Sequence, residues 1–414
     1  MGSLFVELAR QATANARREV ETYTREIPEF GFLDNDSRAR AETLEHALWL
    51  RRRTIDLSPD SSALTGDDLA YIASMGELRA GAGMPLGARR RILWLHTALM
   101  LREINEATEI QRDGGAEEIM RMMNWFAPQG ERGIAAYCQG FVRVLRRRLP
   151  YVEQITLLTR ALLNGDPISA ELASAVGMEL PDYWAVTVIR IPERPVGDRF
   201  LENEIETLVK NHRTPVMWGP EDGDGSGELI ALIPLLSGAA EAEPVPPHAT
   251  LDLSPDLVPD CLSELVRDFA RALGRPCAAG TATAPLSELA DALGRARRIS
   301  RAAPLRRASA RLRPHTLADV FAELAVADVP FVDMWLRDVA RRLESGPDLL
   351  VTLDAYYRHD MHRGATATAL NVHTRTLDYR LRRVRELTGI APGSTRGVRT
   401  LSAVVTRRLS GAWR

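Results

Sequence analysis

The segment LLVTLDAYYRHDMHRGATATALNVHTRTLDYRLRRVRELTGI, Leu349 to Ile390, decides the fold of the C-terminal part of this 414-residue chain. Its first ten residues carry apolar side chains at helical spacing, and the polar run HDMHRG ends that helix. A second, short helix is expected from Ala365 to Leu370, followed by the tight turn NVH. A third begins at Thr374 and is stopped by Gly389. Three short helices in this order predict a helix-turn-helix.

The third predicted helix has two distinct faces. Leu377, Leu381 and Val384 lie at i, i+4 and i+7, so they fall on one side of the helix. We expect that side to pack inward together with Leu370 and Val372. The opposite side is polar and rich in arginine, which leaves it free to contact a ligand.

The polar side suits DNA because the major groove admits an α-helix and presents guanine N7 and O6 to an arginine fork. Arg375 is the best candidate for a base contact because it stands near the helix start. Contacts to phosphates position the protein without reading sequence, and the residues best placed for them are Thr376, Tyr379, Arg380 and Arg383. The full set of predicted DNA-binding residues is His373, Thr374, Arg375, Thr376, Asp378, Tyr379, Arg380, Arg382 and Arg383.

Asp378 is an acid in the middle of the presumed reading face. Three roles stay open for it: accepting a hydrogen bond from a cytosine amino group, pairing with Arg382, or discouraging non-specific binding. Periodicity by itself also fits an ordinary solvated helix rich in arginine.

The same segment resembles the C-terminal helix-turn-helix of the PucR/CdaR family of bacterial transcription regulators. Arg375 departs from the family pattern, which usually has asparagine there, and so does HDMHRG, so the DNA sequence read is expected to differ from that of relatives. The matching positions are Leu349-Leu350, Thr352-Leu353, Ala355-Tyr356, Thr366-Ala367, Ala369-Leu370, Val372-His373, Thr376-Leu377, Tyr379 to Val384 and Leu387-Thr388-Gly389.

Charge is unevenly distributed along the chain. The net charge is −2. From Val351 to Arg414 there are 12 arginines and 4 acids, which gives 12 − 4 = +8 and leaves −10 for the rest. A basic C-terminal module on an acidic body is expected if that module alone contacts a polyanion.

The sequence contains neither a membrane-spanning or signal segment nor a cysteine pattern typical of disulfides or zinc sites. The longest nearly apolar run, Ile92 to Leu101, is far shorter than the ~20 residues of a membrane-spanning helix, and the N-terminus lacks a signal-peptide arrangement. We therefore expect a cytoplasmic protein without membrane contacts. Cys138, Cys261 and Cys277 are widely spaced and lack zinc-site spacing, so no disulfide framework, metal or cofactor is predicted.

The fold class predicted is multidomain and mainly α. Residues 1–150 show helical periodicity, residues 151–178 form a helical connector, and residues 314–414 are helical, with the helix-turn-helix at 349–390. Residues 179–313 alternate between strands and helices and form a small α/β domain. Its expected elements are strands at 183–191, 214–218, 228–235 and 277–283 and helices at 200–210, 257–273 and 286–298.

The resemblance extends upstream with weaker motifs. The α/β domain resembles the family's degenerate GGDEF-like domain, and GAGMPL before an apolar helix gives residues 1–150 a resemblance to the helical sensor domain of RsbR-type stress-signalling proteins. By analogy these two domains sense a signal or dimerise.

Two rival functions compete with DNA binding. A nucleotide-cyclising enzyme would need the GG[DE]EF motif, whereas this hairpin reads DGDGSGE; Asp222, Asp224 and Glu228 could bind a cation but fit an ordinary turn. We therefore predict no enzyme activity and no catalytic residue. A stress-signalling interaction hub is the second rival, and the basic module argues against it as the sole function.

The run from Arg295 to Arg313, with eight arginines and no acid, could touch nucleic acid or form a solvated face.

The function predicted is therefore a sequence-specific DNA-binding transcription regulator, responsive to a signal through its upstream domains. Its predicted partners are double-stranded DNA and further copies of itself, as a homodimer or higher homo-oligomer, with a small-molecule effector as one source of the signal.

Overall fold

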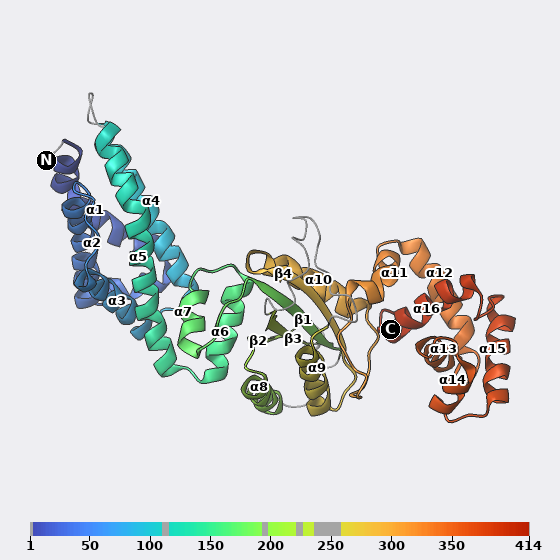
Figure 1. The fold of residues 1–414 in the computed structure, drawn as a ribbon. Helices are drawn as coiled ribbons and strands as arrows, with labels where there is room; N and C mark the ends of the chain where they lie inside the picture. Colours follow the sequence, from blue (N-terminus) through green and yellow to red (C-terminus); the bar gives the residue numbers. More distant parts are fainter. Residues whose placement is uncertain (1–2, 110–115, 193–197, 221–226, 236–257, 414) are drawn as a thin grey trace. The chain divides into compact units, whose positions relative to one another are not determined.

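The chain folds into two compact units, shown as a ribbon in Figure 1. The computed structural model describes residues 3–109, 116–192, 198–220, 227–235 and 258–413. One unit comprises residues 1–154 and 170–178, and the other comprises residues 155–169 and 179–414. Among these described residues helices dominate and one small sheet lies in the second unit, so the predicted fold class is confirmed. Within the described ranges, no helix has the length and apolar character needed to cross a bilayer.

The first unit is all helical, as predicted for the N-terminal residues. Ile92, Leu95, Leu99 and Ile104 are buried, so the apolar face of α4 points inward. Helix α1 packs against α2 and α4, while α3 packs against α5. The helices are α1 (Ser3–Glu26), α2 (Ser37–Leu57), α3 (Gly66–Gly81), α4 (Leu86–Glu109), α5 (Ala116–Arg148) and α7 (Ser169–Val176), with a 3-10 turn at Pro28–Asp34.

Four antiparallel strands form the sheet of the second unit, in the order β2-β3-β1-β4. Strand β1 is central and buried along nearly all its length, which explains its β-branched and aromatic sequence YWAVTVIRI. The strands are β1 (Tyr183–Ile191), β2 (Val216–Pro220), β3 (Gly227–Pro234) and β4 (Ala278–Pro285). The predicted strand 183–191 is correct to the residue, and the other three differ by one or two residues at each end.

Helices cover both faces of this sheet (Figure 1). Helix α10 lies against β4 and β1, where Gly280 lets the backbones approach because a Cβ there would lie 2.4 Å from Ser300 N. On the other face α9 contacts β2 through the rings of Phe269 and Trp218, and α8 packs beside α9. The helices are α6 (Tyr151–Leu163), α8 (Asp198–His212), α9 (Asp260–Leu273) and α10 (Leu289–Ala302).

Six helices complete the chain, and they share one apolar core. Helix α14 begins two residues earlier than predicted because the His362 side chain caps it, accepting a hydrogen bond from Ala365 N at 3.0 Å. The helices are α11 (Leu317–Ala327), α12 (Pro330–Glu344), α13 (Leu349–Arg358), α14 (Arg363–Ala369), α15 (Thr374–Thr388) and α16 (Thr395–Leu409). The three predicted helices of the helix-turn-helix are therefore α13, α14 and α15.

Candidate nucleic-acid interface

Helix α15 is anchored by the residues predicted for its inner face. Leu377, Leu381 and Val384 are buried in the C-terminal core, and Leu370 and Val372 pack against them. An anchor on one face fixes the rotation of the helix about its axis. The opposite face is therefore presented to solvent in a defined orientation.

The start of α15 is shaped by His373, which was predicted to contact DNA. Its backbone is extended and its Nδ1 accepts a hydrogen bond from Arg375 N at 3.2 Å, so this side chain is the N-cap of the helix. Thr374, Arg375 and Thr376 follow on the first turn, and all three are exposed. At the other end Gly389, with φ +73°, stops the helix as predicted. The positive end of the helix dipole thus lies beside the predicted base reader.

Tyr379 and Arg382 form an exposed pair one to two turns further along α15. The guanidinium carbon of Arg382 lies 5.6 Å from the centroid of the Tyr379 ring, a cation–π arrangement. Arg382 also approaches Glu386 at 3.9 Å. The side chains of Tyr379 and Arg382 are both more than half exposed. A DNA phosphate could therefore contact Arg382 without a change in the fold of the domain.

Asp378 pairs with Arg363 of α14, at 3.3 Å between Nε and Oδ1. Pairing with Arg382, one of the three roles considered from the sequence, is not what the structure shows. Both partners are mostly exposed, so the pair contributes little to stability, about 0–1 kcal/mol, and can open when DNA approaches. Arg363 was missed by sequence reasoning because its proximity depends on how α14 crosses α15.

Arg380 differs from the other predicted contacts because its guanidinium is engaged inside the domain. It donates to Asp348 Oδ2 at 2.9 Å and to Thr352 Oγ1 at 3.2 Å, and its side chain is 16% exposed. These bonds tie α15 to the start of α13. Arg383 pairs with Glu386 at 2.9 Å but remains 42% exposed, so it is better available for a phosphate. A phosphate contact by Arg380 stays a prediction.

The helix-turn-helix is bonded to the α/β domain within the second unit. Arg306 donates two hydrogen bonds to the buried Asp354 of α13, at 2.7 and 2.5 Å. Leu305 N donates to Leu409 O at 3.0 Å, and Arg190 donates to Ser410 O at 2.9 Å. The first helix of the DNA-binding motif and the end of α16 therefore both contact the upstream domain.

We expect Arg306→Met to loosen the C-terminal domain. Removing one partner of a fully buried ion pair costs about 3–5 kcal/mol. Arg306 is a quarter exposed and Asp354 also pairs with Arg358 at 2.8 Å, so we expect about 1–2 kcal/mol. Hydrogen exchange of the α13 amides should accelerate by about 5- to 30-fold. The exposed neighbour Arg307→Met is the matched control and should change exchange little; equal effects from both variants would refute the bridge.

The arginine run from Arg295 to Arg313 is used mainly for internal bonds. Four of its eight arginines pair with carboxylates of the same unit and a fifth donates to a backbone carbonyl, so at least half of these charges are compensated and the run is a weaker candidate for a second nucleic-acid contact. The bonds are Arg295 to Thr283 O at 3.0 Å, Arg297 to Glu228 at 2.5 Å, Arg298 to Asp328 at 2.5 Å, Arg306 to Asp354, and Arg313 to Asp319 at 2.8 Å.

Of the acids considered for a cation site, only Glu228 lies within the described residues. Glu228 is buried and held by Arg297, and Asp222 and Asp224 lie outside the described residues. Across the part of the chain that the structure describes, no group of three or more histidines, cysteines and acids is arranged to hold a metal ion.

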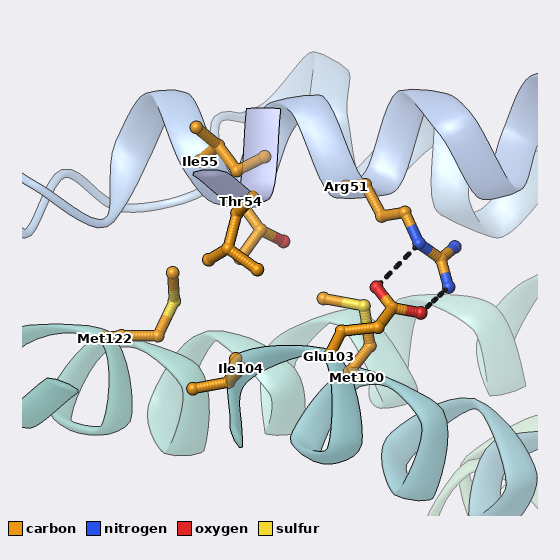
Figure 2. Close-up of a pocket in the computed structure, with 8 residues that line it drawn as sticks. Arg51, Thr54, Ile55, Met100, Glu103, Ile104 and Met122 are labelled. Carbon is orange, nitrogen blue, oxygen red and sulfur yellow. Dashed lines mark hydrogen bonds and ion pairs between the residues drawn. The ribbon is translucent and has the colours of Figure 1, made fainter. Parts of the chain in front are cut away.

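A small cavity lies in the first unit beside a buried ion pair, shown in Figure 2. Arg51 donates to both carboxylate oxygens of Glu103, at 3.0 and 2.6 Å, and also bonds Glu19. Burial alone would raise the pKa of Glu19, but His96 and Arg51 hold it well below its usual range. The cavity, about 20 Å³, is lined by Leu8, Arg51, Thr54, Ile55, Met100, Glu103, Ile104 and Met122. It has room for about one water molecule, far too little for a metabolite.

A wider hollow of about 430 Å³ lies between α5 and α7 in the same unit. It carries both apolar and charged side chains, including Arg143 and Arg146. Arg143 also pairs with Glu77. A hollow of this size matches the lower range of pockets for small molecules, about 300–1,000 Å³.

Comparison with known proteins identifies two parts of the chain. Residues 349–405 match the PucR C-terminal helix-turn-helix domain, and residues 164–302 match the GGDEF-like domain. No curated protein matches the chain. Among solved structures, the chain is similar to a regulator of polyketide synthase expression from Bifidobacterium adolescentis, with 16% identity and a TM-score of 0.25, over 62% of this chain and 98% of that one. That likeness is too weak to support an inference.

Both predicted domain resemblances of the second unit are thereby confirmed. The chain carries the helix-turn-helix domain of PucR-type transcription regulators, and a GGDEF-like domain precedes it. The resemblance of residues 1–150 to an RsbR-type sensor domain stays a prediction.

Proposed function

We propose that this transcription regulator reads a specific DNA sequence through α15, with Arg375 as the base reader, and that its upstream domains receive the signal. One observation carries the proposal: the apolar face of α15 is buried, while its first turn and the side chains of Tyr379 and Arg382 are exposed. A helix held in this way can enter the major groove with its N-terminal residues directed at the bases.

The contacts on α15 would divide into two classes. Arg375 can donate two hydrogen bonds to guanine O6 and N7, which specifies a base. Arg383, Arg382 and Tyr379 lie farther along the helix and suit phosphates, which fix orientation. Arg375 is exposed at the start of the helix, where base contacts usually fall.

The test compares Arg375→Ala with Arg383→Ala on DNA. Binding sites would first be selected from random duplexes with the full-length protein. We expect Arg375→Ala to lose about 1–3 kcal/mol of discrimination at one or two base positions. Arg383→Ala should weaken binding to all sequences and reduce the slope of log K against log salt by about one. Equal effects of both variants on every sequence would contradict this division of roles.

We propose that the signal reaches α15 through the α/β domain, in the cytoplasm. The bonds from Arg306 to Asp354 and from Arg190 to Ser410 support this route because they connect that domain to the helix-turn-helix. The hollow between α5 and α7 offers room for a small-molecule effector. Titrating the protein with candidate metabolites while following DNA affinity would test the coupling, which must be reciprocal.

The protein is proposed to act as a homodimer or higher homo-oligomer. A single helix-turn-helix buries little surface on DNA, and two-fold assemblies that bind paired half-sites are the usual solution.

A further inference from the structure

Helices α11 and α12 expose an unusual number of large apolar side chains. Phe331 is 71% exposed and Phe321 is 64% exposed, although both are aromatic residues of a folded domain. They belong to a set that spans the two consecutive helices: Leu317, Phe321, Phe331, Met334 and Trp335, which we call the α11–α12 face. Leu317 and Phe321 are four positions apart on α11, and Phe331, Met334 and Trp335 lie at i, i+3 and i+4 on α12, so each set lies on one side of its helix. Isolated exposed apolar residues are ordinary, whereas apolar side chains grouped along the outer sides of two consecutive helices indicate an interaction surface.

Helix α11 is apolar on the side that faces solvent as well as on the side that faces the core. Its two acids are used elsewhere: Asp319 binds Arg313 and caps the helix start, and Glu323 is buried. The exposed positions between Leu317 and Ala325 are therefore all leucine, phenylalanine and alanine. A helix that is apolar all round belongs in an interior, so the outer side of α11 is expected to be covered.

The α11–α12 face has the size that a dimer contact needs. With about 200 Å² for a fully exposed large side chain, the exposed fractions of the five residues, from 38% to 71%, amount to about 500 Å². Two copies facing each other would bury about 1,000 Å² of these side chains alone, which reaches the lower bound for a specific interface.

We propose that a second copy of the chain covers the α11–α12 face. This inference rests on the proposed function, because a regulator of paired half-sites needs a two-fold axis near its reading heads. A two-fold interface brings the same patch together with itself, so a border of one charge sign would repel. The charged residues on and next to these two helices carry both signs, as in the ion pairs Asp328–Arg298 and Asp338–Arg341, so opposite charges can face each other across the axis.

The position of α12 connects this interface to DNA reading. Its inner side, including Leu336 and Leu343, belongs to the same core as Leu377 and Leu381 of α15. Pairing two copies through the outer side would hold two reading helices at a fixed separation. The spacing of half-sites on DNA is then set by this contact.

The test measures the mass of the full-length protein without DNA by sedimentation equilibrium. We expect a dimer for the unmodified chain and at least a 100-fold weaker dimer for the double variant F321E/F331E. Both side chains are exposed, so the variant should keep its helical circular dichroism. Trp94→Glu is the matched control, because Trp94 is 69% exposed but lies in the first unit, and it should leave the dimer intact.

A monomeric unmodified chain would overturn the proposal, and so would a dimer that survives F321E/F331E. A DNA-binding measurement distinguishes failure of the α11–α12 interface from failure of the proposed DNA-binding function. If the interface is correct, the double variant should bind a single half-site as tightly as the unmodified chain does and a paired site at least 10-fold more weakly. Equal affinity for the paired site would also overturn the interface. Loss of specific DNA binding by the unmodified chain would refute the proposed function itself.

Discussion

Replacing Gly140 with alanine is expected to destabilise the first unit by about 3 kcal/mol, because α3 and α5 touch backbone to backbone at this point. A Cβ at Gly140 would lie 1.9 Å from Ala73 O, and one at Gly76 would lie 2.2 Å from Tyr137 O. Neither obstacle is the end of a flexible side chain. The two helices would have to separate, and the core between them would lose contacts along their length.

The intrinsic preference of a helix works in the opposite direction. Alanine is favoured over glycine in a helix interior by about 1 kcal/mol, so propensity alone predicts that Gly140→Ala stabilises. The overlap of the new Cβ with the carbonyl oxygen of Ala73 outweighs this preference, so the substitution is expected to destabilise the unit. We expect the amides of α3 to exchange faster in Gly140→Ala than in the unmodified chain. Hydrogen–deuterium exchange with mass spectrometry measures this rate for the first unit separately from the rest of the chain.

Gly133 provides a matched control on the same helix. A Cβ there would meet Ile72 Cδ1 at 3.6 Å, an ordinary contact. Gly133→Ala should therefore leave the unit as stable as before or stabilise it by about 0.5–1 kcal/mol. If both alanine variants shifted exchange in the same direction by the same amount, the close approach of α3 and α5 would not be the cause.

The sequence was sufficient where structure is decided locally. The helices α13 to α15 followed from apolar spacing, a short polar turn and Gly389, all within one 42-residue segment. Strand β1 was found to the residue because its sequence, YWAVTVIRI, is a short run dominated by β-branched and aromatic residues, as a buried strand should be. The inner face of α15 followed in the same way, since helical spacing alone puts Leu377 and Leu381 on one side.

Features that depend on partners distant in the sequence were not predictable. Arg380 looked like a free phosphate ligand, yet it bonds Asp348, 32 positions away. Asp378 met Arg363 rather than Arg382 because the crossing of α14 and α15 places Arg363 nearest. Helix periodicity says which face a residue occupies but not which element lies opposite, so pairing of charges across elements needs the folded geometry.

The first unit is expected to lose stability in mild acid because of the buried His46. The imidazole is buried in the first unit, beside the rings of Trp49 and Tyr71. Its Nδ1 has no hydrogen-bond partner among the described residues. Burial lowers the pKa of His46 to about 3, with further lowering by Arg79 and His96 and a smaller opposing effect of Glu19.

The direction of the pH effect follows from proton binding. In the unfolded chain the pKa of a histidine is near 6.5. Between about pH 6.5 and pH 3 the unfolded chain therefore binds a proton that folded His46 refuses, so the free energy of unfolding falls as the pH falls through this window. The limit is about 1.4 kcal/mol per pH unit. Well above pH 6.5 the group is neutral in both states and contributes no pH dependence.

We therefore expect the first unit to be about 2 kcal/mol less stable at pH 5 than at pH 7.5, and His46→Phe to remove most of that difference. Phenylalanine keeps an aromatic ring beside Trp49 and Tyr71 while abolishing the titration. Exchange of α2 and α3 amides, corrected for the intrinsic pH dependence of exchange, measures the stability of this unit.

The control is His359→Gln in the second unit, which should leave the slope of the first unit's free energy of unfolding against pH unchanged. Working above pH 5 keeps carboxylates such as Glu19, whose pKa is lowered, from contributing to the same slope. A slope that persists in His46→Phe would mean that another group takes up the proton on unfolding.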